Sequence, residues 1–90
     1  MKYSLFKTNQ FKRSFKKLNL SDTEDLIFID IVYNLANGNQ LPEKYKDHQL
    51  QGNLKEFREC HIKPDLLLIY FVENNILKLV DIGSHSQLFE

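Results

Sequence analysis

The segment that decides the fold is the apolar run LLLIYFV, residues 66–72, which Asn74-Asn75 separates from a second strand-like run, ILKLVDI, residues 76–82. A continuous apolar run of this length, bounded by turn residues, is typical of a central strand that is covered on both faces. Two such runs joined by a short polar link predict a pair of adjacent antiparallel strands. The other strands of the second half are expected to extend the sheet outward from this pair.

Further strands are expected upstream of the pair. Residues 54–62 form a plausible strand, which the turn Lys63-Pro64-Asp65 joins to the central run, and the polar segment 48–51 precedes a turn signal at Gly52-Asn53. The tract 39–47 contains a proline and shows no sustained period, so it is interpreted as a loop laid over the surface. The second half therefore predicts an antiparallel meander.

The first half predicts one short strand and an amphipathic helix. Residues 3–6 are an aromatic and apolar stretch typical of an opening strand. Phe11, Phe15 and Leu18 recur at spacings of four and three with basic residues between them. This pattern indicates a helix that begins near Thr8 and turns one apolar side toward a core.

A second helix is expected to begin at a cap on Ser21 or Asp22 and to stop near Gly38. Its predicted apolar side consists of Leu26, Ile27, Ile31 and Leu35. The whole chain, residues 1–90, is thus expected to be one α+β domain, with an N-terminal strand and two helices packed on one face of an antiparallel sheet.

Composition excludes several classes of protein. The 90 residues are 42% apolar and 27% charged, which argues against disorder along the whole chain. The formal net charge is zero, so overall charge identifies no nucleic-acid partner. The first seventeen residues hold six Lys or Arg and no acidic residue, however, and an acidic segment follows. This arrangement suits contact with RNA or an acidic partner, or simply a solvated helix surface.

Compartment and membrane contact follow from the cysteine count and the apolar pattern. Cys60 is the single cysteine, so it forms no intramolecular disulfide and supplies no multi-cysteine zinc site. The opening residues lack the long apolar run of a secretory signal, and no later segment resembles a membrane span. The expected location is the reducing cytoplasm, without membrane contact.

The three histidines, His48, His61 and His85, all lie near predicted strand ends. Strand ends two connections apart in a meander share one edge of the sheet, so these side chains can converge, although the sequence does not force them to. Together with Asp65 they could form a zinc site, but no two stand at the short helical spacing common in such sites. Acid–base chemistry is the favoured interpretation, and no cofactor is expected.

Three motifs carry a resemblance to a known family. The runs YKDHQLQG (residues 45–52), FRECHIKPDLLLIY (57–70) and GSHSQLF (83–89) resemble the YafQ branch of the RelE/ParE toxin superfamily, in the same order and spacing. The resemblance implies a RelE-like fold and a toxin of a type II toxin–antitoxin system. It further implies an endoribonuclease that cleaves mRNA on the ribosome and is silenced by a cognate antitoxin. We expect the domain to be monomeric when free.

The resemblance also assigns functional residues, namely His48, His61, Asp65, His85 and Phe89. Cleavage by the 2′-hydroxyl of the RNA needs a base to remove its proton and an acid to protonate the departing 5′-oxygen. Histidine, with an ordinary pKa near ~6.5, can serve as either at neutral pH. We expect His85 to make one proton transfer and His48 or His61 the other, with Asp65 orienting an imidazole or acting as an alternative base.

Contacts with RNA are expected from three further residues. Lys63 and Arg58 are candidates for stabilising charge on the phosphate, or else are surface residues or partners of Glu59. Phe89 is a candidate for stacking on an mRNA base, or else a hydrophobic latch over the sheet edge.

One position departs from the family pattern. Members of the superfamily commonly carry an arginine two positions before the glycine of the last motif, and this chain has Asp81 there. A carboxylate beside the scissile phosphate would repel it and weaken catalysis. The alternative function is that of a non-catalytic RelE/ParE-fold toxin that inhibits a protein target such as gyrase, which would not need the histidines.

Overall fold

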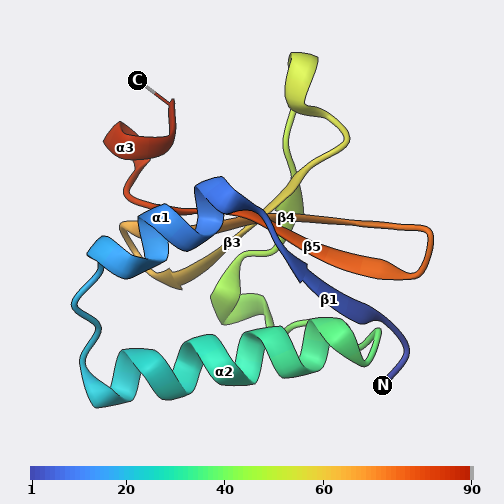
Figure 1. Cartoon of the computed structure of the whole chain (residues 1–90), viewed down its shortest axis with the longest axis horizontal. Helices are drawn as coiled ribbons and strands as arrows, with labels where there is room; N and C mark the ends of the chain where they lie inside the picture. Colours follow the sequence, from blue (N-terminus) through green and yellow to red (C-terminus); the bar gives the residue numbers. More distant parts are fainter. Residues whose placement is uncertain (90) are drawn as a thin grey trace.

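The computed structural model describes residues 1–89 of the chain. The elements follow in the order β1 (Ser4–Lys7), α1 (Asn9–Lys17), α2 (Asp22–Ala36), a 3₁₀ turn (Glu43–Tyr45), β2 (His48–Gln49), a second 3₁₀ turn (Gly52–Leu54), β3 (Arg58–Lys63), β4 (Leu66–Glu73), β5 (Ile76–Gly83) and α3 (His85–Phe89). Figure 1 shows α2 below the strands, α1 level with them, and α3 above α1. This is the α+β class expected from the sequence.

A five-stranded sheet with the order β1-β5-β4-β3-β2 forms the centre of the molecule. β4 is its middle strand, which confirms the interpretation of the apolar run 66–72, and β2 to β5 form the predicted antiparallel meander. β1 instead pairs in parallel with β5, so the sheet is mixed rather than antiparallel. Local turn signals could not reveal this pairing, because β1 and β5 lie at opposite ends of the chain.

The helices begin where the sequence places their caps. The hydroxyl of Thr8 accepts a hydrogen bond from the backbone N–H of Phe11 at the start of α1. Ser21 and Glu24 form a reciprocal capping box at the start of α2, which satisfies two backbone donors that would otherwise lack a partner. At the other end of α2, the backbone of Gly38 has φ +75°, a left-handed conformation that glycine adopts at little cost.

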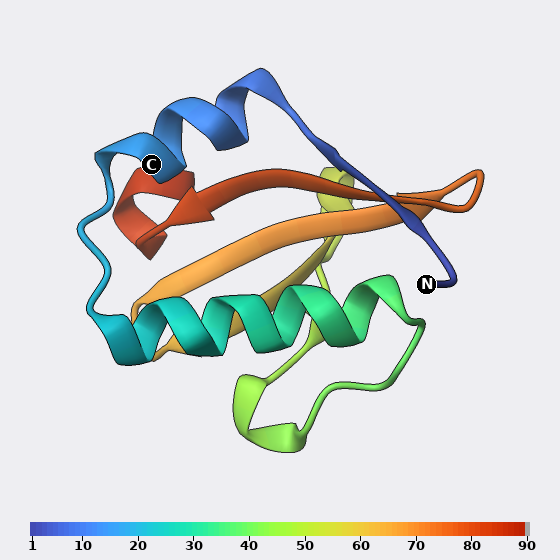
Figure 2. The same cartoon turned by 60° about the horizontal axis from the view of Figure 1, so that its bottom comes forward.

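The main core lies between these helices and one face of the sheet (Figure 2). Phe11 and Phe15 of α1 stack on each other and on Phe28 of α2. Leu26 was expected on the apolar side of α2, but it is 67% exposed, because the helix turns Ile27 and Ile31 toward the sheet instead. Buried strand residues that complete this core are Cys60, Ile62, Leu68, Tyr70, Leu77, Leu79 and Ile82.

Three boundaries differ from the expectations. Residues 39–47 were expected to lie over the surface, but Leu41 and Tyr45 in this tract are buried in the core. The strand expected over residues 54–62 begins only at Arg58, because a 3₁₀ turn occupies Gly52–Leu54. His85 follows the end of the last strand, as expected, but residues 85–89 then form the short helix α3, which was not expected.

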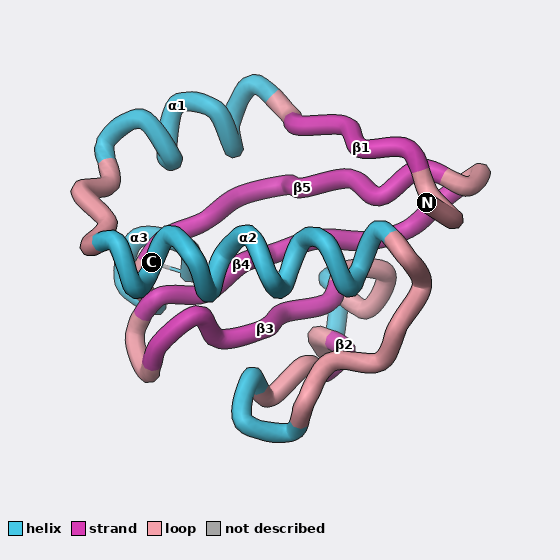
Figure 3. Tube along the Cα trace, turned by 90° about the horizontal axis from the view of Figure 1, so that it is seen from below, coloured by secondary structure: helices cyan, strands magenta, loops and turns pink. Residues whose placement is uncertain are grey.

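The other face of the sheet carries a row of aligned residues. Cα register pairs His48 with Glu59, Glu59 with Ile69 and Ile69 with Asp81, so this row crosses from β2 to β5. Side chains of directly opposed residues in antiparallel strands lie on the same face. Figure 3 shows β2 and β1 at the two edges, with α2 across the face that carries the main core.

Candidate active site

A buried carboxylate, Glu59, occupies the centre of the candidate site. β3 alternates its side chains between the two faces, so Cys60 and Ile62 enter the main core while Glu59 and His61 lie on the other face. Glu59 is 4% exposed and is the one buried charged residue among residues 1–89. A buried carboxylate is costly unless other groups compensate it, so its neighbours are informative.

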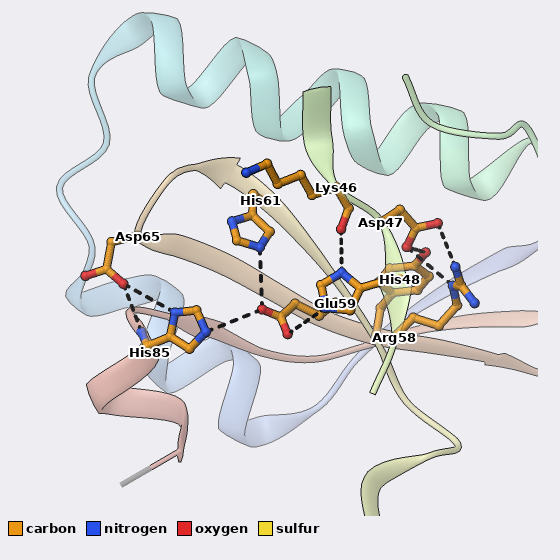
Figure 4. Close-up of polar contacts among 9 residues, drawn as sticks. Lys46, Asp47, His48, Arg58, Glu59, His61, Asp65 and His85 are labelled. Atoms are coloured by element: carbon orange, nitrogen blue, oxygen red, sulfur yellow. Dashed lines mark hydrogen bonds and ion pairs between the residues drawn. The ribbon is translucent and has the colours of Figure 1, made fainter. Parts of the chain in front are cut away.

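All three histidines contact this carboxylate (Figure 4). The Nε2 atom of His48 lies 3.4 Å from Oε2 of Glu59, and the Nε2 atoms of His61 and His85 lie 3.6 and 3.8 Å from Oε1. The ring centroids are 6.3 Å apart for His48 and His61, and 6.4 Å apart for His61 and His85. The convergence that the sequence allowed is thus present, and Glu59 holds it together.

The loop before β2 fixes the tautomer of His48. Its Nδ1 atom lies 2.6 Å from the backbone carbonyl oxygen of Lys46, which can only accept, so Nδ1 carries a proton. Lys46 itself has φ 51°, and this left-handed backbone presents the carbonyl to the ring. The other ring nitrogen, Nε2, is the one that faces the carboxylate of Glu59.

Asp65 positions His85 from the turn between β3 and β4. The backbone N–H of His85 donates to Oδ1 of Asp65 over 3.1 Å, and the Nδ1 atom of the ring lies 3.7 Å from the same oxygen. Ser84 and Gln87 close the first turn of α3 by reciprocal side-chain to backbone hydrogen bonds. His85 therefore lies between two carboxylates, and 60% of its side chain is exposed to solvent.

The two predicted phosphate-binding residues are both in ion pairs, though not with Glu59. The Nε and Nη2 atoms of Arg58 donate to Asp47 over 3.3 and 3.2 Å, and the hydroxyl of Tyr70 donates to the same carboxylate. Lys63 lies 2.7 Å from Glu24 at the start of α2. The side chains of Arg58 and Lys63 remain 42% and 51% exposed, so both cations face solvent near the site.

These contacts shift several pKa values. Burial is the largest single influence on Arg58 and opposes its charge, but the hydrogen bonds that Arg58 donates to Asp47, together with its other interactions with Asp47 and Tyr70, outweigh burial and raise the pKa of the guanidinium. Burial, followed by the hydrogen bond to Asp47, raises the pKa of the Tyr70 hydroxyl. The hydrogen bond from Lys63 lowers the pKa of Glu24. Arg58, Asp47 and Tyr70 therefore form a hydrogen-bonded network beside the histidines.

Cys60 is fully buried in the main core, on the face of β3 opposite to His61. Burial, with the nearby charges of Asp47 and Glu59, raises the pKa of this thiol to about 12. Because the thiolate is the nucleophilic form, Cys60 is not a nucleophile here.

Phe89 and Asp81 are the two remaining positions that the sequence singled out. The ring of Phe89 is 5.7 Å from that of His85 and 41% exposed, so it can receive a planar group. Asp81 accepts hydrogen bonds on Oδ1 from the hydroxyl of Ser14 and from the backbone N–H of Ile82. Neither residue contacts Glu59.

The structure thus brings together His48, His61, Asp65 and His85, while Arg58, Lys63 and Phe89 surround them. The sequence interpretation missed Glu59 as the central group and Asp47 as the partner of Arg58. One signal could have indicated Glu59: it lies two residues before His61 on a strand, and hence on the same face.

Comparisons with known proteins agree on one family. The family described as bacterial toxin of type II toxin-antitoxin system, YafQ, matches residues 3–90. The mRNA interferase toxin YafQ of Escherichia coli K12 is 45% identical over 49 residues, which are 54% of this chain and 53% of that protein. In this alignment the chain spans about half the length of the relative.

Solved structures share the fold over nearly the whole chain. A copper-bound mutant toxin from Helicobacter pylori has a TM-score of 0.90 and 39% identity, covering 97% of this chain and 99% of that one. The toxin in the Escherichia coli DinJ-YafQ toxin-antitoxin complex has a TM-score of 0.81 and 29% identity, covering 100% of both chains.

Proposed function

This chain belongs to the YafQ family of bacterial type II toxins, and we propose that it is an endoribonuclease that cleaves mRNA on the ribosome by acid–base chemistry. The observation that carries the proposal is the contact of three imidazoles with one buried carboxylate, Glu59. Imidazoles transfer protons at neutral pH, and a protein that only blocks a partner needs no such cluster. The relative from Escherichia coli, named an mRNA interferase, supports the same reaction class.

The proposed reaction uses the 2′-hydroxyl of the RNA as nucleophile. One imidazole removes the hydroxyl proton while the 2′-oxygen attacks phosphorus, and another imidazole protonates the 5′-oxygen as the P–O5′ bond breaks. The products are a 2′,3′-cyclic phosphate and a 5′-hydroxyl end. His85 makes one of these transfers and His48 or His61 the other. Each positioned acid or base typically contributes about 10²- to 10⁴-fold in rate.

Glu59 and Asp65 support these transfers. Glu59 stabilises whichever imidazole is protonated, as the carboxylate of a catalytic triad does for its histidine. Asp65 holds the backbone of His85 and faces its Nδ1 atom, so it orients the ring toward the substrate. Arg58 and Lys63 keep their ion pairs with Asp47 and Glu24 and also attract the negatively charged phosphate of bound RNA.

Metal independence is a direct expectation of this mechanism. Cleavage should persist after EDTA treatment, provided that the ribosomes are kept intact with magnesium, because side chains supply both proton transfers. Residues 1–89 contain no group of three or more His, Cys, Asp or Glu side chains placed to hold a metal ion. The copper-bound toxin from Helicobacter pylori makes the measurement worthwhile. A stoichiometric metal ion that is lost together with activity would replace this mechanism with a metal one.

We also propose that a cognate antitoxin binds the toxin, which is otherwise monomeric. A complex of this kind is known for the Escherichia coli relative. The exposed basic residues of α1, namely Lys12, Arg13, Lys16 and Lys17, present a surface suited to an acidic antitoxin segment.

Reversing these four charges to Glu should weaken antitoxin binding by at least about tenfold, because like charges would then face each other. Calorimetric titration measures the change, and reversal of the exposed Lys55, outside α1, is the matched control. An unchanged affinity of the α1 variant would place the interface elsewhere.

No helix within residues 1–89 is long and apolar enough to cross a membrane.

A further inference from the structure

A small cleft lies beside the histidines on the same face of the sheet. Its volume is about 140 Å³, and its lining includes Leu50, Leu54, Phe57, Ile69, Asp81 and Phe89. The walls are thus aliphatic and aromatic, and Asp81 is the charged residue among those that line it. An apolar slot with one polar group is the kind of site that binds a planar ligand in a fixed orientation.

The cleft is continuous with the proposed catalytic centre in two ways. Phe89, which lines the cleft, has its ring 5.7 Å from that of His85. Ile69, which also lines the cleft, stands in register between Glu59 on β3 and Asp81 on β5. A strand of RNA with its scissile phosphate at His85 therefore brings a neighbouring base to this cleft.

The carboxylate of Asp81 is held in one orientation. Its Oδ1 atom accepts from the Ser14 hydroxyl over 2.6 Å and from the Ile82 backbone N–H over 2.8 Å. Both hydrogen bonds end on Oδ1, which leaves Oδ2 as the oxygen with capacity to accept from a ligand. A backbone N–H is an obligatory donor, so the orientation does not depend on the Ser14 hydroxyl alone.

Resting on the proposed ribonuclease function, we propose that this cleft binds the base of one nucleotide that flanks the scissile phosphate and that Asp81 determines its identity. The base stacks on Phe89, as bases of single-stranded RNA stack on aromatic side chains. Oδ2 of Asp81 accepts a hydrogen bond from an exocyclic amino group on the edge of the base that faces the major groove in a duplex. On that edge adenine and cytosine carry an amino group, whereas guanine and uracil carry a keto oxygen that the carboxylate repels.

The variant Asp81→Asn tests this assignment because it keeps the shape of the side chain but replaces one hydrogen-bond acceptor with a donor. The Ile82 N–H and the Ser14 hydroxyl both donate to Oδ1, so the amide oxygen of asparagine takes that place. The amide NH₂ then takes the place of Oδ2 and becomes a donor. A donor there favours the keto oxygen of guanine or uracil, and so the base preference should reverse.

The experiment measures cleavage of ribosome-bound mRNAs in which each nucleotide flanking one cleavage site is varied in turn among the four bases. We expect the unchanged protein to prefer adenine and cytosine at one flanking position by about tenfold, the size of one well-placed base contact. Asp81→Asn should reverse this preference, and Ser14→Ala, which removes one of the two hydrogen bonds that orient the carboxylate, should reduce it. Glu73→Gln, a change of an exposed carboxylate on the β4–β5 hairpin, should leave it unchanged.

The outcomes separate this inference from the proposed function. Cleavage by the unchanged protein without preference between amino and keto bases at either flanking position would overturn the role of Asp81 and leave the ribonuclease function intact. The same holds if Asp81→Asn cleaves with the profile of the unchanged protein. Absence of any cleavage by the unchanged protein would overturn the proposed function, and this inference with it.

Discussion

Replacement of His85 by alanine is expected to lower mRNA cleavage by about 10²- to 10⁴-fold, the usual contribution of a positioned proton-transfer group. The ring lies between Glu59 and Asp65 and is the most exposed of the three imidazoles around the buried carboxylate. It is therefore the one best placed to meet the RNA. Growth inhibition by the toxin should disappear with the cleavage.

The same substitution should cost little stability. The side chain of His85 is 60% exposed and the residue lies on the short helix α3, so truncation opens no cavity in the core. The free energy of unfolding should change by less than about 0.5 kcal/mol, as measured by denaturant titration. Ser86→Ala, at the next exposed position of the same helix, should keep full activity and serve as control. Full toxicity of His85→Ala at matched expression would favour inhibition of a protein target instead.

Replacement of Glu59 by glutamine is expected to have an effect of similar size, at least about 10²-fold on the cleavage rate. The amide keeps the volume of the side chain but removes the negative charge within 3.4 to 3.8 Å of three Nε2 atoms. Without that charge the imidazolium formed during proton transfer loses its counter-ion. The rate constant for cleavage of bound mRNA, measured in single-turnover experiments, reports this loss directly.

Two measurements show whether the Glu59→Gln effect is chemical. The melting temperature should not fall, because an uncharged amide is easier to bury than a carboxylate. The affinity for the antitoxin should also be unchanged, because Glu59 is buried. Glu73→Gln, at an exposed carboxylate, is the matched control. A Glu59→Gln protein that cleaves at the normal rate would mean that the carboxylate only packs the histidines.

The sequence predicted the parts of the fold that depend on local patterns. Caps at Thr8 and Ser21, the turn at Asn74-Asn75 and the central apolar strand were each visible as short-range signals, and the structure confirms them. The parallel pairing of β1 with β5 was not visible, because no turn connects the two strands. The exposure of Leu26 was missed because this residue lies at the edge of the apolar stripe of α2. Spacing alone does not show whether such a residue faces the core or solvent, because packing of the helix against the sheet determines this.

The candidate site was only partly predictable for the same reason. Motif spacing singled out His48, His61, Asp65 and His85, but their convergence depends on strand register and on an irregularity in the β3–β4 pairing between His61 and Lys63. Glu59 escaped notice because a Glu beside an Arg suggests a surface ion pair. In the structure Arg58 forms its ion pair with Asp47, and Glu59 contacts the histidines instead.

The central claim, cleavage through the 2′-hydroxyl at the histidine cluster, is tested most directly by one substitution in the RNA. Two ribosome-bound mRNAs are compared that differ only in a 2′-deoxy nucleotide on the 5′ side of a mapped cleavage site. The account predicts that the ribonucleotide strand is cut there, leaving a 2′,3′-cyclic phosphate, and that the deoxy strand stays intact at that position. Equal cutting of both strands at the mapped site would contradict it.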